Sequence, residues 1–359
     1  MTKTPNRLLI AASGTGGHLF PALAVAEKLT DYRIEWLGVP DRLETSLVPK
    51  SYPLHTIAVE GFQERFGLNT LRIFQRLASS IRQVRRLLKE RQIQLVFTTG
   101  GYIAGPTILA ARSLGLPVIL HESNAIPGKV TRWFAPLCSS VALGFQEAAQ
   151  YLPRSRTVWV GTPVREAFLT PQKLDLPVPE AAFAIVVVGG SQGAVAINQI
   201  VRECAPAWFA AGAYIIHITG DRDPDAHLLE HPQYLSLPFY QNMAALFQRA
   251  NLAISRAGAG TLTELAVAKT PAILIPYPYA AEDHQAYNAA VFQTAGAALV
   301  DAQAQLTPEI LKTQVLDLLA HPEQLAQMAK QTAALAVTDS SDRLAKLLQS
   351  TLDAQVMKK

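Results

Sequence analysis

The sequence predicts an α/β protein with two doubly wound domains, each built on a parallel sheet. Short runs rich in Val, Ile and Leu alternate with amphipathic stretches along the whole chain, which is typical of buried parallel strands separated by helices. A strand followed by a glycine-rich turn and a helix start occurs near the beginning of each half, and a doubly wound domain opens in this way. The length of 359 residues fits two domains of ordinary size.

The elements follow the same rhythm in both halves. We expect strands at 7–12, 34–37, 95–98, 118–121, 140–143 and 158–160, then at 184–188, 214–218, 234–237, 252–255, 272–275 and 298–300. The clearest helical stretches of the first half are 21–29, 71–90 and 106–114. This pattern predicts an N-terminal domain over 1–162, a second domain over 163–338, and a C-terminal helix over 339–359 that packs back on the first domain.

Composition limits the class of protein. Hydrophobic residues make up 49% of the chain, enough to fill two cores, and the net charge of +4 does not by itself suggest nucleic acid. Cys138 and Cys204 have neither metal-site spacing nor a framework of pairs, so we expect two small buried thiols in a reducing cytoplasm. The long uncharged stretches 92–111 and 181–201 are each interrupted by a Gly-Gly pair, so no segment is expected to span a membrane.

Three glycine-rich turns follow predicted strands, at 13–18, 99–101 and 189–194. A glycine turn at a helix start directs backbone N–H groups and the helix dipole toward an anion. Each turn alone is explained equally well as tight backbone geometry, but three of them at strand ends predict a cleft lined by amides. The first turn is one residue too compact for a dinucleotide fingerprint, and Glu35 lies inside its strand, which disfavours an oxidoreductase.

Seven motifs, taken in order, resemble the MurG family of N-acetylglucosaminyltransferases and span nearly the whole chain. They lie at 13–21, 100–102, 121–124, 161–165, 189–194, 256–264 and 283–288. The resemblance implies a GT-B fold, in which two Rossmann-like domains face a central cleft. It also implies inverting transfer of GlcNAc from UDP-GlcNAc to the C4 hydroxyl of MurNAc in undecaprenyl-pyrophosphoryl-MurNAc-pentapeptide. This is the conversion of lipid I to lipid II in peptidoglycan biosynthesis, and no cofactor or metal is implied.

The chain departs from the family pattern at a few positions. Ser13 stands where glycine is commoner, and Ala257 stands where serine often follows the arginine. Phe239-Tyr240 replaces the family's phenylalanine and small apolar residue near the uracil. A main-chain contact to uracil tolerates this change, so donor affinity is affected more readily than substrate class.

The N-terminal domain carries the expected catalytic residue. His18 lies at the start of the first helix, where the dipole disfavours the imidazolium, and a neutral imidazole can act as a general base toward the acceptor hydroxyl. A histidine that only satisfies the turn or contacts phosphate fits the same position. We expect Thr15, Gly16 and Gly17 to bind substrate through the turn, with Asn124 as a sugar contact. Arg165, after Pro163, suits a phosphate or a structural ion pair.

The second domain carries the expected donor site. Ser191 and the amides around it would hold the diphosphate. An N-cap serine is the alternative, but Gly189-Gly190 allows close backbone approach and favours the diphosphate. The resemblance places Tyr240 near the uracil and the run from Ala259 through Gly260, Thr261, Leu262 and Thr263 along the donor. Glu264 can accept from both ribose hydroxyls, and first-turn helix charge is its alternative. Gln285 offers a donor and an acceptor to sugar hydroxyls, as would any solvated turn.

Two further features have competing interpretations. The Asp221-Arg222-Asp223 sequence contains the Asp-x-Asp pattern that carries a divalent ion in other glycosyltransferases, but ordinary turn chemistry explains it without a metal. The stretch 66–91 interleaves apolar residues with Arg72, Arg76, Arg82, Arg85, Arg86, Lys89 and Arg91. It predicts a patch for an anionic membrane surface, because no aromatic platform or recognition motif supports nucleic acid.

Three functions are therefore compared. The first is a MurG-like transferase, peripheral on the cytoplasmic side of the bacterial plasma membrane, whose partners are UDP-GlcNAc, lipid I and cell-wall or division proteins. The second is another enzyme of the same architecture, either a different lipid glycosyltransferase or a UDP-sugar epimerase. The third is a non-catalytic scaffold of the division machinery, which would bind UDP-GlcNAc without turnover.

Overall fold

The computed structural model describes residues 5–59, 70–190 and 193–357, apart from the side chains of 70–74. The chain forms two compact units: unit 1 comprises Met1–Arg165 and Thr338–Lys359, and unit 2 comprises Glu166–Val337. The sequence predicted changes of domain after residues 162 and 338. Each unit is described below on its own.

Unit 1 is built on a sheet of seven parallel strands in the order β3-β2-β1-β4-β5-β6-β7. The strands are β1 (Asn6–Ala11), β2 (Tyr32–Gly38), β3 (Leu54–Thr56), β4 (Leu95–Thr98), β5 (Val118–Glu122), β6 (Ser140–Leu143) and β7 (Thr157–Trp159). The sequence predicted all of them except β3, a three-residue edge strand whose pattern is too short to recognise.

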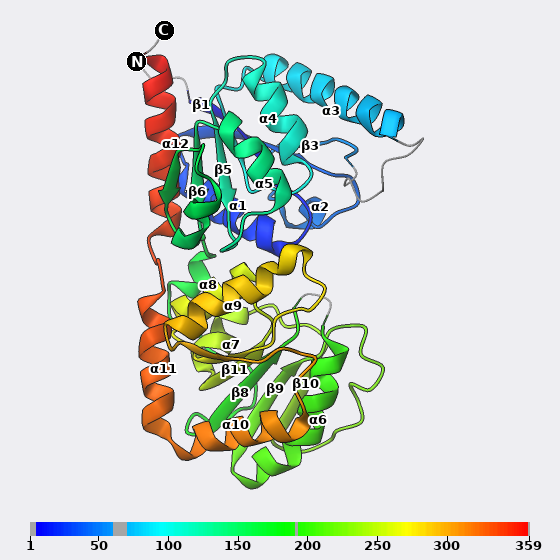
Figure 1. Cartoon of the computed structure of the whole chain (residues 1–359), viewed down its shortest axis with the longest axis vertical. Coiled ribbons are helices and arrows are strands. Elements are labelled where there is room, and N and C mark those ends of the chain that lie inside the picture. Colours follow the sequence, from blue (N-terminus) through cyan, green and yellow to red (C-terminus); the bar gives the residue numbers. More distant parts are fainter. Residues whose placement is uncertain (1–4, 60–69, 191–192, 358–359) are drawn as a thin grey trace. The chain divides into compact units, whose positions relative to one another are not determined.

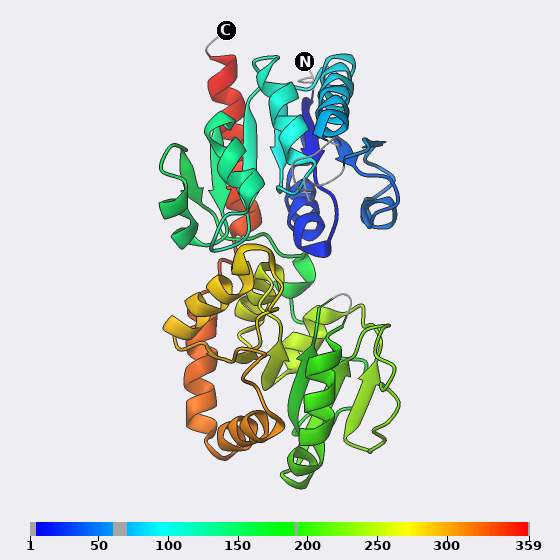
Figure 2. The same cartoon turned by 45° about the vertical axis from the view of Figure 1, so that its right-hand side comes forward.

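Helices cover both faces of this sheet. Successive side chains of β1 point to opposite faces, so each face has its own core. Leu8 and Ile10 face a core shared with α1 (Gly16–Lys28) and α12 (Ser340–Val356). Leu9 and Ala11 face the core under α3 (Thr70–Glu90) and α4 (Ala104–Arg112). Figure 2 shows the two helical layers on either side of the strands. The shorter helices α2 (Glu44–Leu47) and α5 (Lys129–Phe134) lie in the connections.

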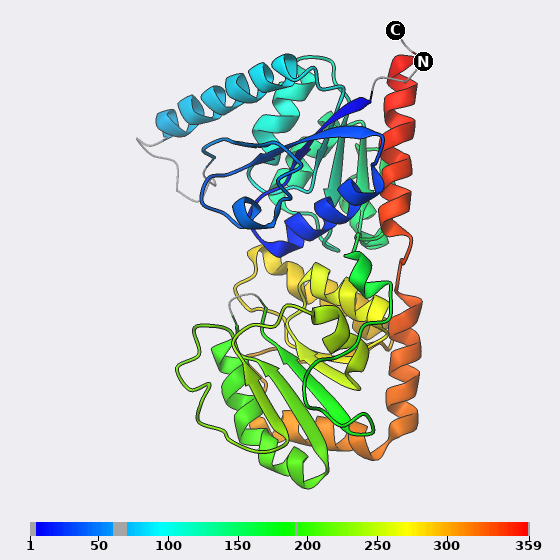
Figure 3. The same cartoon turned by 180° about the vertical axis from the view of Figure 1, so that it is seen from behind.

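The C-terminal helix α12 belongs to unit 1, where it packs beside α1 (Figures 1 and 3). Leu344, Leu348 and Leu352 lie four residues apart and are at most 3% exposed. This spacing puts all three on one helix face, which closes the core over β1. At the start of the helix the Arg343 guanidinium lies 5.6 Å from the Trp159 ring centre.

Unit 2 has six parallel strands in the order β10-β9-β8-β11-β12-β13. The strands are β8 (Phe183–Val188), β9 (Ala213–Ile218), β10 (Tyr234–Leu237), β11 (Leu252–Ser255), β12 (Ala272–Leu274) and β13 (Ala298–Val300). The helices are α6 (Val195–Ala210), α7 (Met243–Arg249), α8 (Ala259–Ala268), α9 (His284–Thr294), α10 (Pro308–Ala320) and α11 (Pro322–Ala334). The sequence predicted every one of these six strands.

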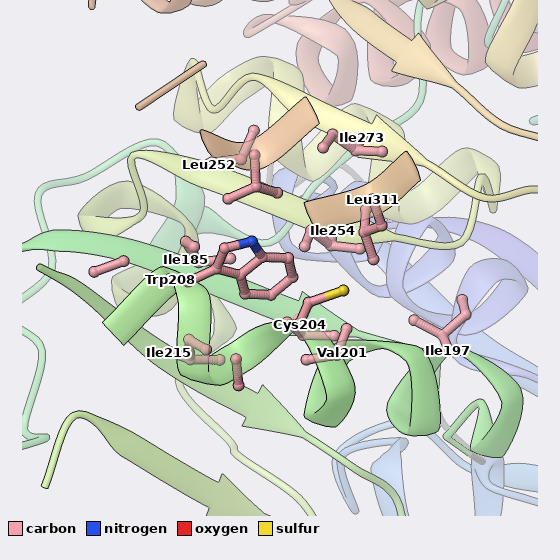
Figure 4. Close-up of a cluster of buried hydrophobic side chains, with 14 of the residues drawn as sticks. Ile185, Ile197, Val201, Cys204, Trp208, Ile215, Leu252, Ile254, Ile273 and Leu311 are labelled. Carbon is pink, nitrogen blue, oxygen red and sulfur yellow. The ribbon is translucent and has the colours of Figure 1, made fainter. Parts of the chain in front are cut away.

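A hydrophobic core of unit 2 lies where α6 and α10 cover one face of the sheet (Figure 4). Trp208 is fully buried there, and its indole Nε1–H donates to the Lys312 carbonyl at 3.5 Å. Cys204 lies beside it and is also fully buried. Ile185, Ile254 and the other β-branched side chains of the strands form the side of this core that the sheet supplies.

Both sheets share one topology. In each unit the first strand lies in the middle of the sheet, and the next two strands are added on one side of it. The chain then crosses over and adds the remaining strands on the other side. The strand order therefore reverses between β1 and β4 in unit 1 and between β8 and β11 in unit 2. In open α/β sheets, ligands bind outside the carboxyl ends of the strands at this reversal. The fold therefore points to the turns after β1 and β4 in unit 1, and after β8 and β11 in unit 2. Within the described residues, no helix has the length and apolar character needed to cross a bilayer.

Candidate active site

The turns after β1 and β4 meet at His18 in unit 1. The residue lies in the first turn of α1, and its side chain is half-buried. Its Nδ1 atom lies 2.7 Å from the Thr99 carbonyl oxygen, directly after β4. Because a carbonyl only accepts, Nδ1 carries the proton of the neutral ring, and Nε2 is left with the lone pair that a general base requires.

Two glycines make room for the exposed side of this imidazole. Gly100 and Gly101 have φ values of +90° and +73°, which favour glycine. A Cβ atom on Gly101 would lie 3.9 Å from His18 Nε2, and one on Gly100 would lie 3.8 Å from Cε1. A side chain at either position would therefore begin in van der Waals contact with the imidazole.

A buried carboxylate organises the loop after β5. Glu122 is 6% exposed. Its Oε1 atom accepts from the backbone and side-chain nitrogens of Asn124, each at 3.0 Å. Its Oε2 atom accepts from the Thr131 hydroxyl at 2.6 Å and the Gly128 N–H at 3.3 Å. Glu122 therefore positions Asn124 and holds the loop that leads into α5.

A second buried carboxylate lies under the first glycine turn. Glu44 is fully buried. It accepts from the Ser13 hydroxyl, the Gly14 N–H at 3.3 Å and the Val39 N–H at 2.7 Å. Burial of an ionised carboxylate is tolerated only when hydrogen bonds compensate it. The turn is thus fixed at Ser13 and Gly14, while the N–H groups of Gly16 and Gly17 belong to the first helical turn, which has no intrahelical acceptor for them.

Arg165 reaches the same helix start through an aromatic ring. Its guanidinium carbon lies 4.4 Å from the ring centre of Phe20, a favourable cation–π geometry. The Phe20 ring in turn packs on Gly16, where a Cβ atom would lie only 2.7 Å from Cε2. The structure thus brings the predicted Gly16 and Arg165 to the helix start that carries His18. The predicted Thr15 is the N-cap of this helix, and the predicted Gly17 lies in its first turn.

The turn after β8 opens the site of unit 2. Gly193 has φ +75°, and a Cβ atom on it would lie 2.1 Å from the Thr219 carbonyl oxygen. A Cβ atom on Gly189 would lie 2.4 Å from the Ala194 nitrogen. Both glycines are therefore required by close backbone packing. The predicted diphosphate contact Ser191 lies outside the described residues.

The start of α8 follows β11 and supplies a second set of amides. The helix begins at Ala259 after the N-cap Gly258, which has no side chain to cap it. The N–H groups of Ala259, Gly260 and Thr261 therefore point out of the helix end at the carboxyl edge of the sheet. No acidic residue lies in this first turn, so the positive end of the helix dipole faces outward without a competing carboxylate.

Leu262, Thr263 and Glu264 follow along the same helix. Leu262 is fully buried and its N–H donates to the Gly258 carbonyl at 3.0 Å, so in this structure it is a packing residue. The Thr263 hydroxyl donates to the Ala259 carbonyl at 2.9 Å. Glu264, one turn after Gly260, is half-buried on the helix that supplies the amides.

Gln285 is fixed beside these amides by its own side chain. Its Oε1 atom accepts from the N–H groups of Ala257 at 3.1 Å and Tyr277 at 2.9 Å. This fixes the amide orientation, so Nε2 presents its two protons to any ligand hydroxyl. Arg256 is buried, donates to the carbonyls of Ile275 and Pro276 and to Gln303, and is therefore a structural residue.

Tyr240 lies on the loop after β10, and its hydroxyl donates to the Asp175 carboxylate. Burial, followed by this hydrogen bond, raises the pKa of Tyr240 to about 12. The neighbouring Phe239 is 71% exposed.

The Asp-x-Asp sequence has a structural role at its second aspartate. Asp223 accepts from the Arg202 guanidinium at 2.7 and 3.3 Å and from the Asn198 side-chain amide at 2.7 Å. Burial alone would raise the pKa of Asp223, but these hydrogen bonds outweigh it and lower the pKa. Within the part of the chain that the structure describes, no group of three or more His, Cys, Asp or Glu side chains is arranged to hold a metal ion.

Two cavities lie away from these turns. One of about 590 Å³ in unit 1 is lined by Asn6, Tyr32 and Leu29, at the amino ends of β1 and β2. One of about 500 Å³ in unit 2 is lined by Leu299, Gln314 and Met328. Neither is lined by a predicted site residue. Because ligands of open α/β sheets bind at the carboxyl ends of the strands, the turns and not these cavities form the candidate site.

Comparison with known proteins agrees with this geometry. Residues 8–143 match the glycosyltransferase family 28 N-terminal domain, and residues 184–344 match the glycosyltransferase family 28 C-terminal domain. A relative from Gloeothece citriformis is 67% identical over 360 residues, covering 100% of both chains. Its name is UDP-N-acetylglucosamine–N-acetylmuramyl-(pentapeptide) pyrophosphoryl-undecaprenol N-acetylglucosamine transferase. A relative of the same name from Nostoc punctiforme is 65% identical over 98% of this chain and 100% of its own.

A solved structure gives the same answer. The crystal structure of Acinetobacter baumannii MurG aligns with a TM-score of 0.79 and 31% identity over 96% of this chain and 100% of that one. The chain belongs to the MurG family of glycosyltransferase family 28. Its two doubly wound units give the GT-B fold, as the sequence predicted.

Sequence reasoning missed the carboxylate that supports the candidate site in unit 1. Glu44 lies in a short helix after β2 and contacts Ser13, 31 residues earlier in the chain. A single acidic residue in a polar connection resembles a solvated surface position. Two features distinguish Glu44 from such a surface residue: its complete burial, and the serine at position 13, where glycine is commoner. Burial of a polar side chain has no sequence signal.

Proposed function

We propose that this chain transfers N-acetylglucosamine from UDP-N-acetylglucosamine to the N-acetylmuramyl sugar of an undecaprenyl-pyrophosphoryl pentapeptide. The observation that carries the proposal is the full-length identity of 67% to a relative named for this reaction. The geometry supports it, because each unit has a glycine-rich turn and a helix start at its topological reversal. A diphosphate occurs in both proposed substrates, and helix starts of this kind bind phosphate groups.

The donor is assigned to unit 2. The amides of Ala259, Gly260 and Thr261 at the α8 start receive the diphosphate, together with the 189–194 turn that contains Ser191. Glu264 accepts from the two ribose hydroxyls, and the Gln285 amide donates to a sugar hydroxyl. The main chain at Tyr240 contacts the uracil. Negative charge that develops on the leaving UDP is stabilised by these amides and by Arg165.

The acceptor and the base are assigned to unit 1. The C4 hydroxyl of the muramyl sugar attacks the anomeric carbon of the donor sugar, and the bond from that carbon to the diphosphate oxygen breaks. His18 Nε2 accepts the hydroxyl proton, while Nδ1–H remains bonded to Thr99. Asn124 contacts a sugar and is held in place by Glu122.

Peripheral attachment to the cytoplasmic face of the plasma membrane is proposed for α3. Its side chains at Ser80, Val84 and Leu88 are buried in unit 1. The outer face exposes basic residues that attract anionic headgroups, namely Arg76, Arg82, Arg85, Arg86 and Lys89. The acceptor's undecaprenyl chain stays in the bilayer, so attachment brings the enzyme to its substrate. The predicted Arg72 side chain lies outside the described side chains. Proteins of cell-wall synthesis and cell division are proposed partners at this surface.

The decisive experiment follows labelled GlcNAc from UDP-GlcNAc into a short-chain lipid I analogue. The proposal expects one disaccharide product and one UDP per turnover, and no UDP release without acceptor. UDP release without acceptor would indicate an epimerase or hydrolase instead. Binding of UDP-GlcNAc without any turnover would indicate a scaffold protein, and transfer to other lipid sugars only would indicate a different lipid glycosyltransferase.

The donor assignment has a separate test in Glu264→Ala. Loss of a carboxylate that accepts from two ribose hydroxyls should raise the KM for UDP-GlcNAc about 10–100-fold, because hydrogen bonds to a charged group contribute about 1.5–3 kcal/mol. Steady-state kinetics with varied donor measures the change, and binding of uracil alone serves as the control because it lacks the ribose. An unchanged KM would remove Glu264 from the donor site.

A further inference from the structure

A buried polar network lies behind the donor turn of unit 2. Asn198 on α6 and His217 on β9 are fully buried. His217 Nε2 lies 2.9 Å from Asn198 Oδ1, and its Nδ1 lies 2.8 Å from the Tyr234 hydroxyl. Asp223 and Arg202 complete the network as an ion pair with a 2.7 Å contact.

The partners determine where the protons lie. The Asn198 amide nitrogen donates to the Thr219 carbonyl at 2.9 Å and to Asp223 at 2.7 Å, so its oxygen is the acceptor. His217 must then donate from Nε2 and accept the Tyr234 proton at Nδ1. Burial, and then the Arg202 charge, lower the pKa of His217 to about 3, and burial raises the pKa of Tyr234 to about 12. At neutral pH the donors and acceptors of the Asn198 and His217 side chains therefore all have hydrogen-bond partners.

The Thr219 carbonyl links this network to the donor turn. The same oxygen that accepts from Asn198 lies where a Cβ atom on Gly193 would approach to 2.1 Å. Gly193 also donates its N–H to the Gly190 carbonyl at 3.0 Å, which closes the turn. A shift of Thr219 would thus move Gly193, because two backbones in van der Waals contact cannot move independently.

We infer that Asn198 is a positioning residue for the donor, which holds Thr219 against Gly193 and so fixes Gly193 just before α6, the helix start assigned to the diphosphate. The inference rests on the proposed function, because it concerns the turn assigned to UDP-GlcNAc. Asn198 does not touch the substrate. Its two amide protons tie α6 and the end of β9 to each other at the point where the turn is packed.

The effects of the two hydrogen bonds that the Asn198 amide donates can be separated by a pair of variants. In Asn198→Asp the donor to Thr219 is lost and two carboxylates face each other. In the double variant Asn198→Asp with Asp223→Asn, an amide and a carboxylate face each other again, and the carboxylate at position 198 lies one helical turn from Arg202. Thr219 still lacks its donor in the double variant. The stability lost to carboxylate repulsion should therefore recover, while the unpaired Thr219 carbonyl and the effect on Gly193 remain.

The test compares the KM for UDP-GlcNAc, kcat and the melting temperature of both variants. The matched control is Thr270→Val, which removes a buried 2.7 Å hydrogen bond to the Phe247 carbonyl at the amino end of β12, the end of the sheet away from the site. We expect the double variant to melt above Asn198→Asp and near Thr270→Val, but to keep a KM raised about tenfold, since small misplacements of binding groups have effects of this order. The control should melt lower and keep its KM.

Two results would overturn the inference. One is a normal KM in the double variant, and the other is a KM in Thr270→Val that rises as much as in Asn198→Asp. Calorimetric binding of UDP to the same variants gives a readout that does not depend on an acceptor. If wild type bound UDP but transferred no sugar, the proposed function would fail while the effect of Asn198 on UDP binding could still be measured.

Discussion

The hydrogen bond between His18 and the Thr99 carbonyl decides which imidazole nitrogen can act as a base. It holds the proton on Nδ1 and directs Nε2 toward the glycine pair at 100–101. The ring is held by backbone rather than by a carboxylate, since Glu122 is occupied by Asn124, Thr131 and Gly128. The sequence located the residue from its place at a helix start, but its hydrogen-bond partner is 81 residues away.

His18→Ala should lower kcat far more than donor affinity. Removal of a general base typically costs about 10²–10⁴-fold in rate, whereas the donor is assigned to unit 2. Transfer kinetics measures the first effect and calorimetric binding of UDP-GlcNAc the second. Glu264→Ala is the matched contrast, because it should raise the donor KM with a smaller effect on kcat. A kcat near that of wild type would assign His18 a role in the turn only.

The two thiols should react slowly in the folded protein. Burial raises the pKa of Cys138 to about 12, and burial followed by the Glu203 charge raises that of Cys204 to about 12, from the ordinary 9.0. At pH 8 the thiolate fraction then falls to about 10⁻⁴, and the thiolate is the reactive form. Alkylation by iodoacetamide should therefore be about 1,000-fold slower than for a free thiol, and faster in denaturant. Rapid native labelling of either residue would contradict the raised pKa of its thiol.

At the scale of elements, α3 separates into a buried and a basic face. Ser80, Val84 and Leu88 recur every four residues and lie buried in unit 1, while arginines occupy the outer face. The same helix can therefore be changed on its outer side without disturbing the fold. Arg86 is paired with Glu90 at 2.6 Å, so its substitution would also remove an ion pair within the helix.

Reversal of charge at Arg76 and Arg82 should weaken binding to anionic vesicles at least about tenfold. Each basic residue near such a surface contributes about 1 kcal/mol, and the effect is screened by salt. Vesicle sedimentation with and without anionic lipid measures it. Reversal of the exposed Arg154 and Arg156 gives a control with the same change in net charge. Equal loss in both variants would mean that overall charge matters and that α3 is not the docking surface.

Most elements were predictable because their signal is local. Strands such as 95–98 and 252–255 are short apolar runs between turn residues, and the structure has them at those residues. The glycine turns were also predictable, since a positive φ nearly requires glycine. Glu44, Glu122 and Asn198 could not be assigned their supporting roles, because those roles depend on partners brought close only by folding. The roles proposed for the site residues remain predictions until they are tested.

At the scale of the whole molecule, unit 1 is discontinuous in sequence and unit 2 is continuous. The last helix contributes three leucines to the unit 1 core, and none of these is adjacent in sequence to the strands it covers. The stability of unit 1 therefore depends on residues at both ends of the chain. Unit 2 has its own core, which includes Trp208 and Leu318.

Leu348→Ala should destabilise unit 1 by about 2–5 kcal/mol, the usual range for loss of a fully buried leucine. Leu318→Ala is the matched variant in unit 2, where the side chain is 1% exposed. Hydrogen exchange read by mass spectrometry should show faster exchange in β1 and β4 for the first variant, and in β8 and β11 for the second. Equal acceleration in both units by either variant would show that they unfold as one.

The return of α12 to unit 1 also orders events during synthesis. When residue 165 leaves the ribosome, the sheet that carries His18 still lacks one covering helix, and all of Glu166–Val337 must be made before that helix appears. At about 5–20 residues per second this interval lasts about 9–35 s. Because α11 ends at Ala334 and α12 begins at Ser340, the last helices of the two units are made almost together. Until then Leu8, Ile10 and their neighbours in the unit 1 core lack part of their covering layer and need temporary protection from aggregation.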